Sequence, residues 1–306
     1  MVSAQTLFRS LADAPGASRV LAEIGELHRL QGRYADALEC YDESFRIAEE
    51  IPDETARQVA RAHALKGSGV VATWQGDYEA ARKFDDESLL IRRNLSDKPG
   101  VAVLLNNLAV LARFVHDLDT ARRLNDESIL LLREVGDQWA VGQLLNNQAC
   151  IASDQGDYDH ARVLLNESLA IRRQLGDRVG LALSLNTLAD VVIDDGDFEA
   201  APPLLAESLA INRELGDNTS IAYLVEDYAA VAANEGRSEQ ALRLAGFSAA
   251  LRIVVGAPLP PAELQRVERL LAPARSAVDT ITAETCWKEG QRFAETIDLD
   301  GLFSMA

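Results

Sequence analysis

Residues 75–78 read Gln-Gly-Asp-Tyr, and the same four residues return at 155–158. Related turns occur at His116-Asp117-Leu118, Gly196-Asp197-Phe198 and Gly236-Arg237-Ser238, with an earlier copy at Gln31-Gly32-Arg33-Tyr34. From position 76 to position 236 the turns recur every 40 residues, whereas the earlier copy lies 44 residues before position 76. A fixed period in this range is the signature of a solenoid of stacked units. Because solenoids usually present a long curved surface, the repeat favours a binding function over a catalytic one.

Residues 98–136 show what one unit contains. Apolar residues recur at helical spacing from Val101 to Val115 and again from Leu118 to Val135. Asp117 lies where the second helix needs an N-cap, and Gly136 fits the C-terminal end of that helix. We therefore predict that each unit consists of helix A, a tight turn, helix B and a short link. The equivalent N-cap residues are Asp77, Asp157 and Asp197, and the link is repeated as Gly176-Asp177 and Gly216-Asp217.

Small residues recur at one position in each helix and indicate where backbones approach closely. In helix B they are Ala81, Ala121, Ala161, Ala201 and Ala241, and in helix A they are Gly69, Ala109, Ala149, Ala189 and Ala229. A serine also recurs in helix B, at Ser44, Ser88, Ser128, Ser168 and Ser208. Because no histidine recurs beside it, a nucleophilic serine has no base, and we predict a packing role and no enzymatic activity.

The composition of the chain restricts its partners. Its 306 residues include 48 acidic and 30 basic side chains, for a formal net charge of −18. Such a surface repels nucleic acids and anionic membranes, so we expect it to bind neither directly. The three cysteines, Cys40, Cys150 and Cys286, form no paired motif, and no apolar run approaches the length of a membrane span. We expect a cytoplasmic protein with no cofactor and no metal site.

The residues of one repeat resemble a known family. A small residue in helix A, a Gly-Asp-Tyr turn and an Ala three residues after the Tyr resemble the tetratricopeptide repeat. The 40-residue form, with Asn-Asn-Leu-Ala at 106–109 and Glu-Ser-Leu-Ala-Ile-Arg-Arg-Gln-Leu-Gly-Asp at 167–177, is similar to the repeats of kinesin light chains. It is more similar to the C-terminal repeats of bacterial LuxR-type, maltose-regulator-type signal-transduction ATPases. The resemblance covers roughly residues 17–256. It implies an all-α, right-handed superhelix (an α-solenoid) of helix A/helix B pairs.

One column of helix B departs from the family pattern. The aromatic residue expected four positions after the helix B alanine is present as Tyr41. It is replaced in later repeats by Asp85, Asn125, Leu165 and Leu205. This departure is usual for the long form and leaves the predicted fold unchanged.

The predicted domain organisation has three parts. Residues 1–16 would form an N-terminal helix, at about 3–13, that is a possible remnant of a preceding repeat. Residues 17–256 would form about six repeats, at 17–52, 53–96, 97–136, 137–176, 177–216 and 217–256. Residues 257–306 would form a helical cap, with helices from about 262 to 278 and 281 to 294. Pro202 and Pro203 predict a delayed start or a kink in their helix B.

The resemblance also implies where a ligand binds, because helix A lines the concave face of tetratricopeptide solenoids. The inner positions recur with the repeat, and one column reads Gly67, Asn107, Asn147, Thr187, Asp227. The candidate groove residues are Lys66, Trp74, Asn106, Asn107, Arg113, Phe114, Gln143, Asn146, Asn147, Asn186, Asp190, Tyr223 and Glu226. In peptide-binding relatives an Asn matching Asn107 and Asn147 often holds the ligand main chain. The alternative is that these amides bond neighbouring helices, and that Trp74 and Phe114 pack under the turns.

We therefore predict a non-enzymatic binding domain, the sensor or protein-interaction segment of a bacterial transcriptional or signalling regulator. It would bind a peptide, a protein segment or a small molecule in the concave groove. Family members often carry an ATPase or another effector domain upstream, so this chain is a possible fragment of a larger regulator. The sequences at 250–252, at 256–261 and at Trp287-Lys-Glu-Gly-Gln-Arg292 also resemble the closing segment of those regulators. The alternative is a constitutive assembly scaffold that uses the convex face or the cap, with Trp287 and Phe293.

Overall fold

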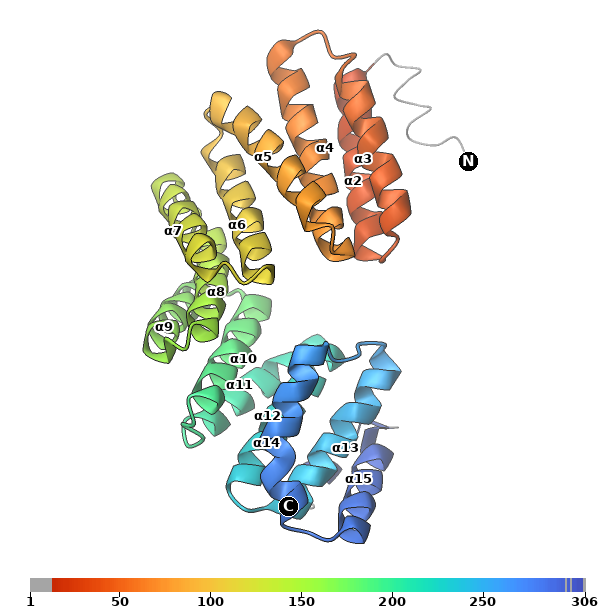
Figure 1. Ribbon diagram of the computed structural model, residues 1–306, viewed down its shortest axis with the longest axis vertical. Coiled ribbons are helices and arrows are strands. Elements are labelled where there is room, and N and C mark those ends of the chain that lie inside the picture. Colours follow the sequence, from red (N-terminus) through yellow and green to blue (C-terminus); the bar gives the residue numbers. More distant parts are fainter. Residues whose placement is uncertain (1–12, 295, 298, 305–306) are drawn as a thin grey trace. The chain divides into compact units, whose positions relative to one another are not determined.

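The computed structural model describes residues 13–294, 296–297 and 299–304, and in these residues the regular elements are α-helices and no strands. The chain divides into two compact units, and the division falls inside α8, between Ile151 and Ala152. Figure 1 shows that antiparallel helix pairs follow one another along the chain within each unit. The predicted helix at 3–13 lies almost entirely outside the described residues.

The helices alternate between helix A and helix B, as predicted. In the first unit they are α2 (Ala14–Leu30), α3 (Tyr34–Ala48), α4 (Glu54–Gln75), α5 (Tyr78–Asn94), α6 (Lys98–Phe114), α7 (Leu118–Val135) and most of α8 (Gln138–Asp154). In the second unit they are α9 (Tyr158–Leu175), α10 (Arg178–Asp194), α11 (Ala201–Leu215), α12 (Asn218–Asn234) and α13 (Ser238–Val255). The even-numbered helices up to α12 are therefore helices A, and their odd-numbered successors are helices B.

The repeated turn works as its sequence indicates. Asp77 caps α5 by accepting a hydrogen bond of 3.0 Å from the backbone N–H of Ala80, and Asp117 and Asp157 cap α7 and α9 in the same way. The preceding residue adopts a left-handed conformation, with φ 79° at Gly76. His116 replaces this glycine and still takes φ 59°, so the turn geometry is kept at some conformational cost.

One predicted cap is wrong. Asp197 does not cap α11, because the two prolines delay the start of this helix to Ala201, with Ala200 at the N-cap position. Pro202 therefore lies in the first turn of α11. Backbone N–H groups in the first turn have no helical partner, so the absence of an N–H in proline costs no helical hydrogen bond there. The Asp197 carboxylate instead accepts a hydrogen bond from Arg162 at 2.9 Å.

The recurring serine ties helix B to helix A within the repeats. In five repeats the serine hydroxyl donates to a backbone carbonyl 26 residues earlier, for example Ser88 to Ala62 at 2.8 Å and Ser128 to Ala102 at 2.7 Å. The same bond joins Ser44 to Ser18, Ser208 to Ala182 and Ser248 to Ala222. The Ser168 hydroxyl lies 2.9 Å from the Ser184 hydroxyl. These serines are fully buried, so the small side chain both permits close packing and fixes the pairing of the two helices.

Two glycines in α4 make room for side chains of the two flanking helices B, α3 and α5. A Cβ added at Gly67 would lie 2.2 Å from the Tyr41 ring, and one added at Gly69 would lie 2.7 Å from Asp85 Oδ1. The sequence Lys66-Gly67-Ser68-Gly69 therefore serves helix packing, inside a helix and not in a phosphate-binding loop. The positions of Tyr41 and Asp85 belong to the helix B column that departs from the family pattern.

Ion pairs link successive helices B on their exposed side. Arg93 of α5 reaches Glu127 of α7 at 3.1 Å, and Arg173 of α9 reaches Glu207 of α11 at 2.8 Å. Both pairs join residues 34 positions apart. Their side chains are about half exposed, so each pair contributes little stability by itself.

The C-terminal segment forms three further helices, α14 (Pro261–Ser276), α15 (Thr280–Ala294) and α16 (Leu299–Ser304). The first two correspond to the predicted cap helices, and α16 was not predicted. Helix α15 packs against α13 at very short range, because Gly246 and Gly290 face backbone atoms of the opposite helix. Helix α14 packs against α12 and α13. Among the described helices, none is long and apolar enough to cross a membrane.

Candidate ligand-binding face

The side chains predicted to bind a ligand in the first unit come from three successive helices A. Helix α4 carries Lys66 and Trp74, helix α6 carries Asn106, Asn107, Arg113 and Phe114, and helix α8 carries Gln143, Asn146 and Asn147. We call the surface formed by these side chains, without the buried Asn146, the helix-A face of the first unit. Its chemistry is dominated by amides and by the two aromatic rings.

Two amides of adjacent repeats are hydrogen-bonded to each other. Asn147 Nδ2 donates to Asn106 Oδ1 at 2.9 Å, and both side chains are half-buried. The alternative reading of the sequence, that these amides bond neighbouring helices, is therefore correct for this pair. A primary amide can make up to four hydrogen bonds, so both residues keep donors or acceptors for a second partner.

Asn107 lies beside a buried carboxyl group that the sequence did not single out. Asp85 of α5 is 1% exposed, and neither of its oxygens makes a well-formed hydrogen bond with the described residues. Burial raises the pKa of Asp85 to about 7, against the opposing effects of the Asn107 amide and the Lys66 ammonium group. The Asn107 Nδ2 group is itself buried without a well-formed hydrogen bond, so this corner of the face has unused polar capacity.

The Lys66 ammonium group is close enough to this corner of the face to lower the pKa of Asp85. The Lys66 side chain is half-buried, and burial lowers the pKa of its ammonium group, while Glu26 acts in the opposite direction. Burial also lowers the pKa of His63, one helical turn earlier on α4. The burial of Asp85 and Lys66 thus shifts the pKa of each group toward its neutral form.

The two aromatic residues differ in their surroundings. Trp74 is 62% exposed at the end of α4. Phe114 is 48% exposed, and its ring stacks on Tyr78 with centroids 5.9 Å apart and planes 8° from parallel. Phe114 is thus partly the packing residue that the alternative reading proposed, whereas Trp74 presents a large apolar surface. Arg113 of α6 and Gln143 of α8 are also exposed.

Two predicted groove residues are corrected by the structure. Asn146 is only 5% exposed, because its side chain points into the helix packing. Glu226 of α12 is 8% exposed and forms a two-pronged ion pair with Arg252 of α13, at 2.7 and 2.8 Å. Ser248 also donates to Glu226, at 2.6 Å. Both side chains serve the interior and are not available to a ligand.

The remaining predicted residues of the second unit also have partners in the chain. Tyr223 lies under the Arg252 guanidinium, which is 3.9 Å from the ring centroid. Asn186 accepts a hydrogen bond from Ser208 Oγ. Asp190 forms an ion pair of 2.9 Å with Arg266, a residue of α14. The sequence analysis did not predict these contacts, because each partner lies 22 to 76 residues away in the sequence.

Arg266 joins α14 to the helices A of the second unit. Besides Asp190, its guanidinium contacts Asp194 at 3.1 Å and Asp227 at 3.2 Å. Asp227 is 4% exposed, and its pKa is raised well above the ordinary range by burial and by Asp190, while Arg266 lowers it. The acidic cluster that the sequence offers to a cationic ligand is therefore bound to an arginine of the same chain.

The site contains no evident metal centre. Over the residues that the structure describes, no group of three or more His, Cys, Asp or Glu side chains is arranged to hold a metal ion. The three cysteines are not disulfide-bonded.

Comparison with family models decides the identity of the repeat. A tetratricopeptide-repeat model matches three overlapping stretches, 61–134, 100–174 and 141–214, which together span half of the chain. A second tetratricopeptide-repeat model matches residues 19–51. The chain belongs to the tetratricopeptide repeat family. Its tetratricopeptide repeats therefore include all of the helices that carry the helix-A face of the first unit.

Solved structures share the fold at low sequence identity. The crystal structure of BtubC from P. vanneervenii is 19% identical and has a TM-score of 0.60, covering 69% of this chain and 85% of its own. The Rap conjugation gene regulator of plasmid pLS20, solved in complex with the Phr* peptide, is 13% identical with a TM-score of 0.65, covering 94% and 75%. The apo form of RapI is 14% identical with a TM-score of 0.61, covering 89% and 99%. No curated protein gives a significant match.

Proposed function

We propose that this chain is a non-enzymatic binding domain that holds a peptide or protein segment against the helix-A face of the first unit. The amides of Asn106, Asn107 and Asn147 would bond the ligand main chain, and Trp74 would contact an apolar ligand side chain. An amide both donates and accepts, so it can satisfy a peptide group whatever the ligand sequence is.

The observation that carries this proposal is the position of α14 in the second unit. Arg266 of α14 binds Asp227, which stands in the repeat column of Asn107 and Asn147. In the second unit, helix α14 of the same chain thus already contacts the helices A, and its Arg266 forms an ion pair with the residue of this column. We infer that the same column in the first unit receives a segment of another molecule. The Rap regulator of pLS20, which shares the fold, was solved with a peptide ligand, and this supports the choice of a peptide.

Beyond peptide binding, we also propose a regulatory role for this chain. The segments at 250–252, 256–261 and 287–292 resemble the closing segment of maltose-regulator-type proteins. We propose that ligand binding here is the sensing step of a bacterial cytoplasmic regulator, whose ATPase or other effector domain would respond to it. The response would be a shift in the population of conformers, driven by the differential affinity of the ligand.

A peptide library displayed on phage and selected on the immobilised chain tests the binding role. We expect enriched peptides to bind the wild type, and the double variant Asn107→Ala, Asn147→Ala to bind at least about tenfold more weakly, since hydrogen bonds to buried groups are lost. The matched control is Asn94→Ala, Asn166→Ala, which removes two exposed amides from helices B. Equal affinity of all three proteins for the selected peptides would refute the proposal.

The alternative is a constitutive scaffold, and one observation favours it. An apolar hollow of about 350 Å³ lies beside Trp287 of α15, between Leu242 of α13 and Arg275 of α14. The Arg275 guanidinium lies 5.8 Å from the Trp287 ring centroid. If Trp287→Ala abolishes binding to the selected peptides while the asparagine variant does not, the scaffold reading replaces the first proposal.

A further inference from the structure

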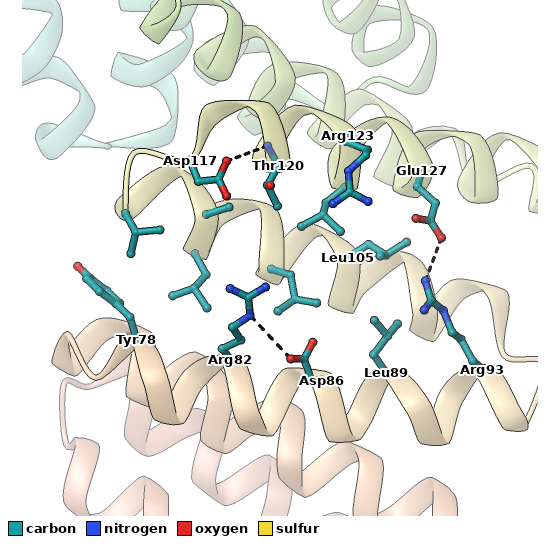
Figure 2. A pocket seen from close by; sticks show the side chains of 15 residues that line it. Tyr78, Arg82, Asp86, Leu89, Arg93, Leu105, Asp117, Thr120, Arg123 and Glu127 are labelled. Atoms are coloured by element: carbon teal, nitrogen blue, oxygen red, sulfur yellow. Dashed lines mark hydrogen bonds and ion pairs between the residues drawn. The ribbon is translucent and has the colours of Figure 1, made fainter.

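A second cleft lies on the opposite side of the first unit. It has a volume of about 260 Å³ and opens between the helices B α5 and α7, above the helix A α6. Its floor is apolar and consists of Leu89, Leu105, Leu108 and Leu124. Figure 2 shows Arg82 extending from α5 and Arg123 from α7 into the space above this floor.

This cleft is separate from the helix-A face. Both surfaces include residues of α6, but on different sides of that helix. Leu105, Leu108 and Ala112 line the cleft. At 3.6 residues per turn, they lie on average roughly 130° around the helix axis from Asn106 and Asn107 of the helix-A face. A ligand in the cleft therefore cannot touch the amides, and the inference made here does not depend on the function proposed above.

The equivalent junction two repeats later shows why the cleft is open. There, Arg162 crosses from α9 to the turn before α11 and contacts Asp195 at 2.6 Å and Asp197 at 2.9 Å. In the first unit the residue 80 positions before Asp195 is Val115, which has no charge. Asp117, which corresponds to Asp197, is engaged in capping α7 through the Thr120 N–H.

Arg82, the counterpart of Arg162, is consequently left without a strong partner. It makes a contact of 3.8 Å with Asp86, and both of these side chains are more than half exposed. A pair of this kind is worth little in water. Arg93 at one end of the cleft is paired with Glu127, as Figure 2 shows.

Arg123 supplies the second guanidinium group of the cleft. Among the side chains that the structure describes, no carboxylate forms an ion pair with it. Two arginines with unused donors thus face a leucine floor, in a protein whose net charge is −18. Guanidinium groups bind carboxylates through paired hydrogen bonds, and an apolar floor accepts a hydrocarbon body.

We propose that the cleft between α5 and α7 binds a small amphipathic carboxylate. Its carboxylate is held by Arg82 and Arg123, and its apolar body lies on Leu105 and Leu108. The volume lies just below the usual range for drug-sized ligands, so the ligand is a short acid and not a long-chain lipid.

Octanoate is the probe for this site, with octanol as the uncharged probe of the same length. Titration followed by calorimetry, and by the methyl signals of Leu105 and Leu108, is expected to show saturable binding of octanoate and at least about tenfold weaker binding of octanol. Bound octanoate should also raise the melting temperature of the chain.

Variants of neighbouring arginines separate this proposal from nonspecific binding. Arg123→Gln is expected to weaken octanoate binding at least about tenfold, and Arg82→Gln likewise. Arg122→Gln removes the same charge from an exposed position of α7 outside the cleft and is expected to bind as the wild type does. Because both α7 arginines are exposed, neither substitution should unfold the chain, which circular dichroism verifies. Equal affinities of the three arginine variants, or no saturable binding of octanoate at millimolar concentration, would overturn the proposal.

Discussion

At the scale of single residues, Asp85 is a buried carboxyl group that lies beside Asn107 of the candidate site. It occupies the helix B position that Tyr41 fills in the first repeat, and Gly69 makes room for it as Gly67 does for Tyr41. A carboxyl group in this apolar environment is costly when it is charged, and this cost explains its pKa of about 7.

The raised pKa of Asp85 predicts a pH-dependent stability. In the unfolded chain the pKa is about 3.9, so between pH 4 and 7 the unfolded state releases a proton that the folded state keeps. Stability should therefore fall as the pH rises through this window, by at most roughly 4 kcal/mol. Asp85→Asn removes the ionisation, and we expect it to raise the melting temperature at pH 8 more than at pH 5. Glu79→Gln, at an exposed acidic residue of the same helix, should change both values equally, and an equal effect of Asp85→Asn at the two pH values would contradict the prediction.

The sequence predicts repeats and turns well but predicts side-chain partners poorly. The Asp caps at 77, 117 and 157 follow from contacts three residues long, which a local pattern contains. The resemblance to the repeat family places the column of Glu226 on the concave face, and this is why the sequence assigns Glu226 to the groove. Its partner Arg252 comes from helix B, 26 residues later, and no period in the sequence indicates that pairing. The sequence marks Asp85 only as a residue that replaces the expected aromatic side chain in helix B. It does not predict that this carboxyl group is buried, because a sequence pattern does not indicate the burial of a carboxyl group.

At the scale of helices, the position of α14 distinguishes the two units. The sequence predicted a capping helix in this region, but it did not place that helix across α10 and α12. Arg266 of α14 contacts three aspartates on those two helices. The neighbouring Arg269 makes a single described ion pair, with Asp194 at 3.2 Å, and is largely exposed.

We predict that Arg266→Gln loosens α14. The substitution leaves Asp227 buried without its cation, and removing one partner of a buried ion pair typically costs about 3 kcal/mol or more. Hydrogen exchange of the α14 amides should become markedly faster, and the second unit should unfold at lower denaturant concentration. Arg269→Gln is the matched control, and it should leave exchange in α14 nearly unchanged because an exposed pair contributes little. If both variants exchange alike, Arg266 does not hold the helix in place.

At the scale of the whole molecule, the chain is a series of local interactions. Helices pack mainly against helices one or two positions away in the sequence. The serine bonds within repeats span 26 residues, and the helix B ion pairs span 34. In such a protein stability is approximately a sum over repeats and their nearest-neighbour interfaces. This locality is also why the repeat pattern in the sequence was sufficient to predict the fold.

Because the interactions are local, we predict that a substitution that destabilises one repeat affects mainly that repeat and its neighbours. Ser88→Ala removes the hydrogen bond to the Ala62 carbonyl, which then keeps only its helical partner, and this loss should cost about 1 kcal/mol. Ser248→Ala removes the equivalent bond to Ala222 in the second unit and serves as the reciprocal variant. Hydrogen exchange followed by mass spectrometry should show faster exchange in α4 and α5 for the first variant, and in α12 and α13 for the second. Faster exchange throughout both units in either variant would mean that the chain unfolds as one cooperative body, and that stability is not additive along the repeats.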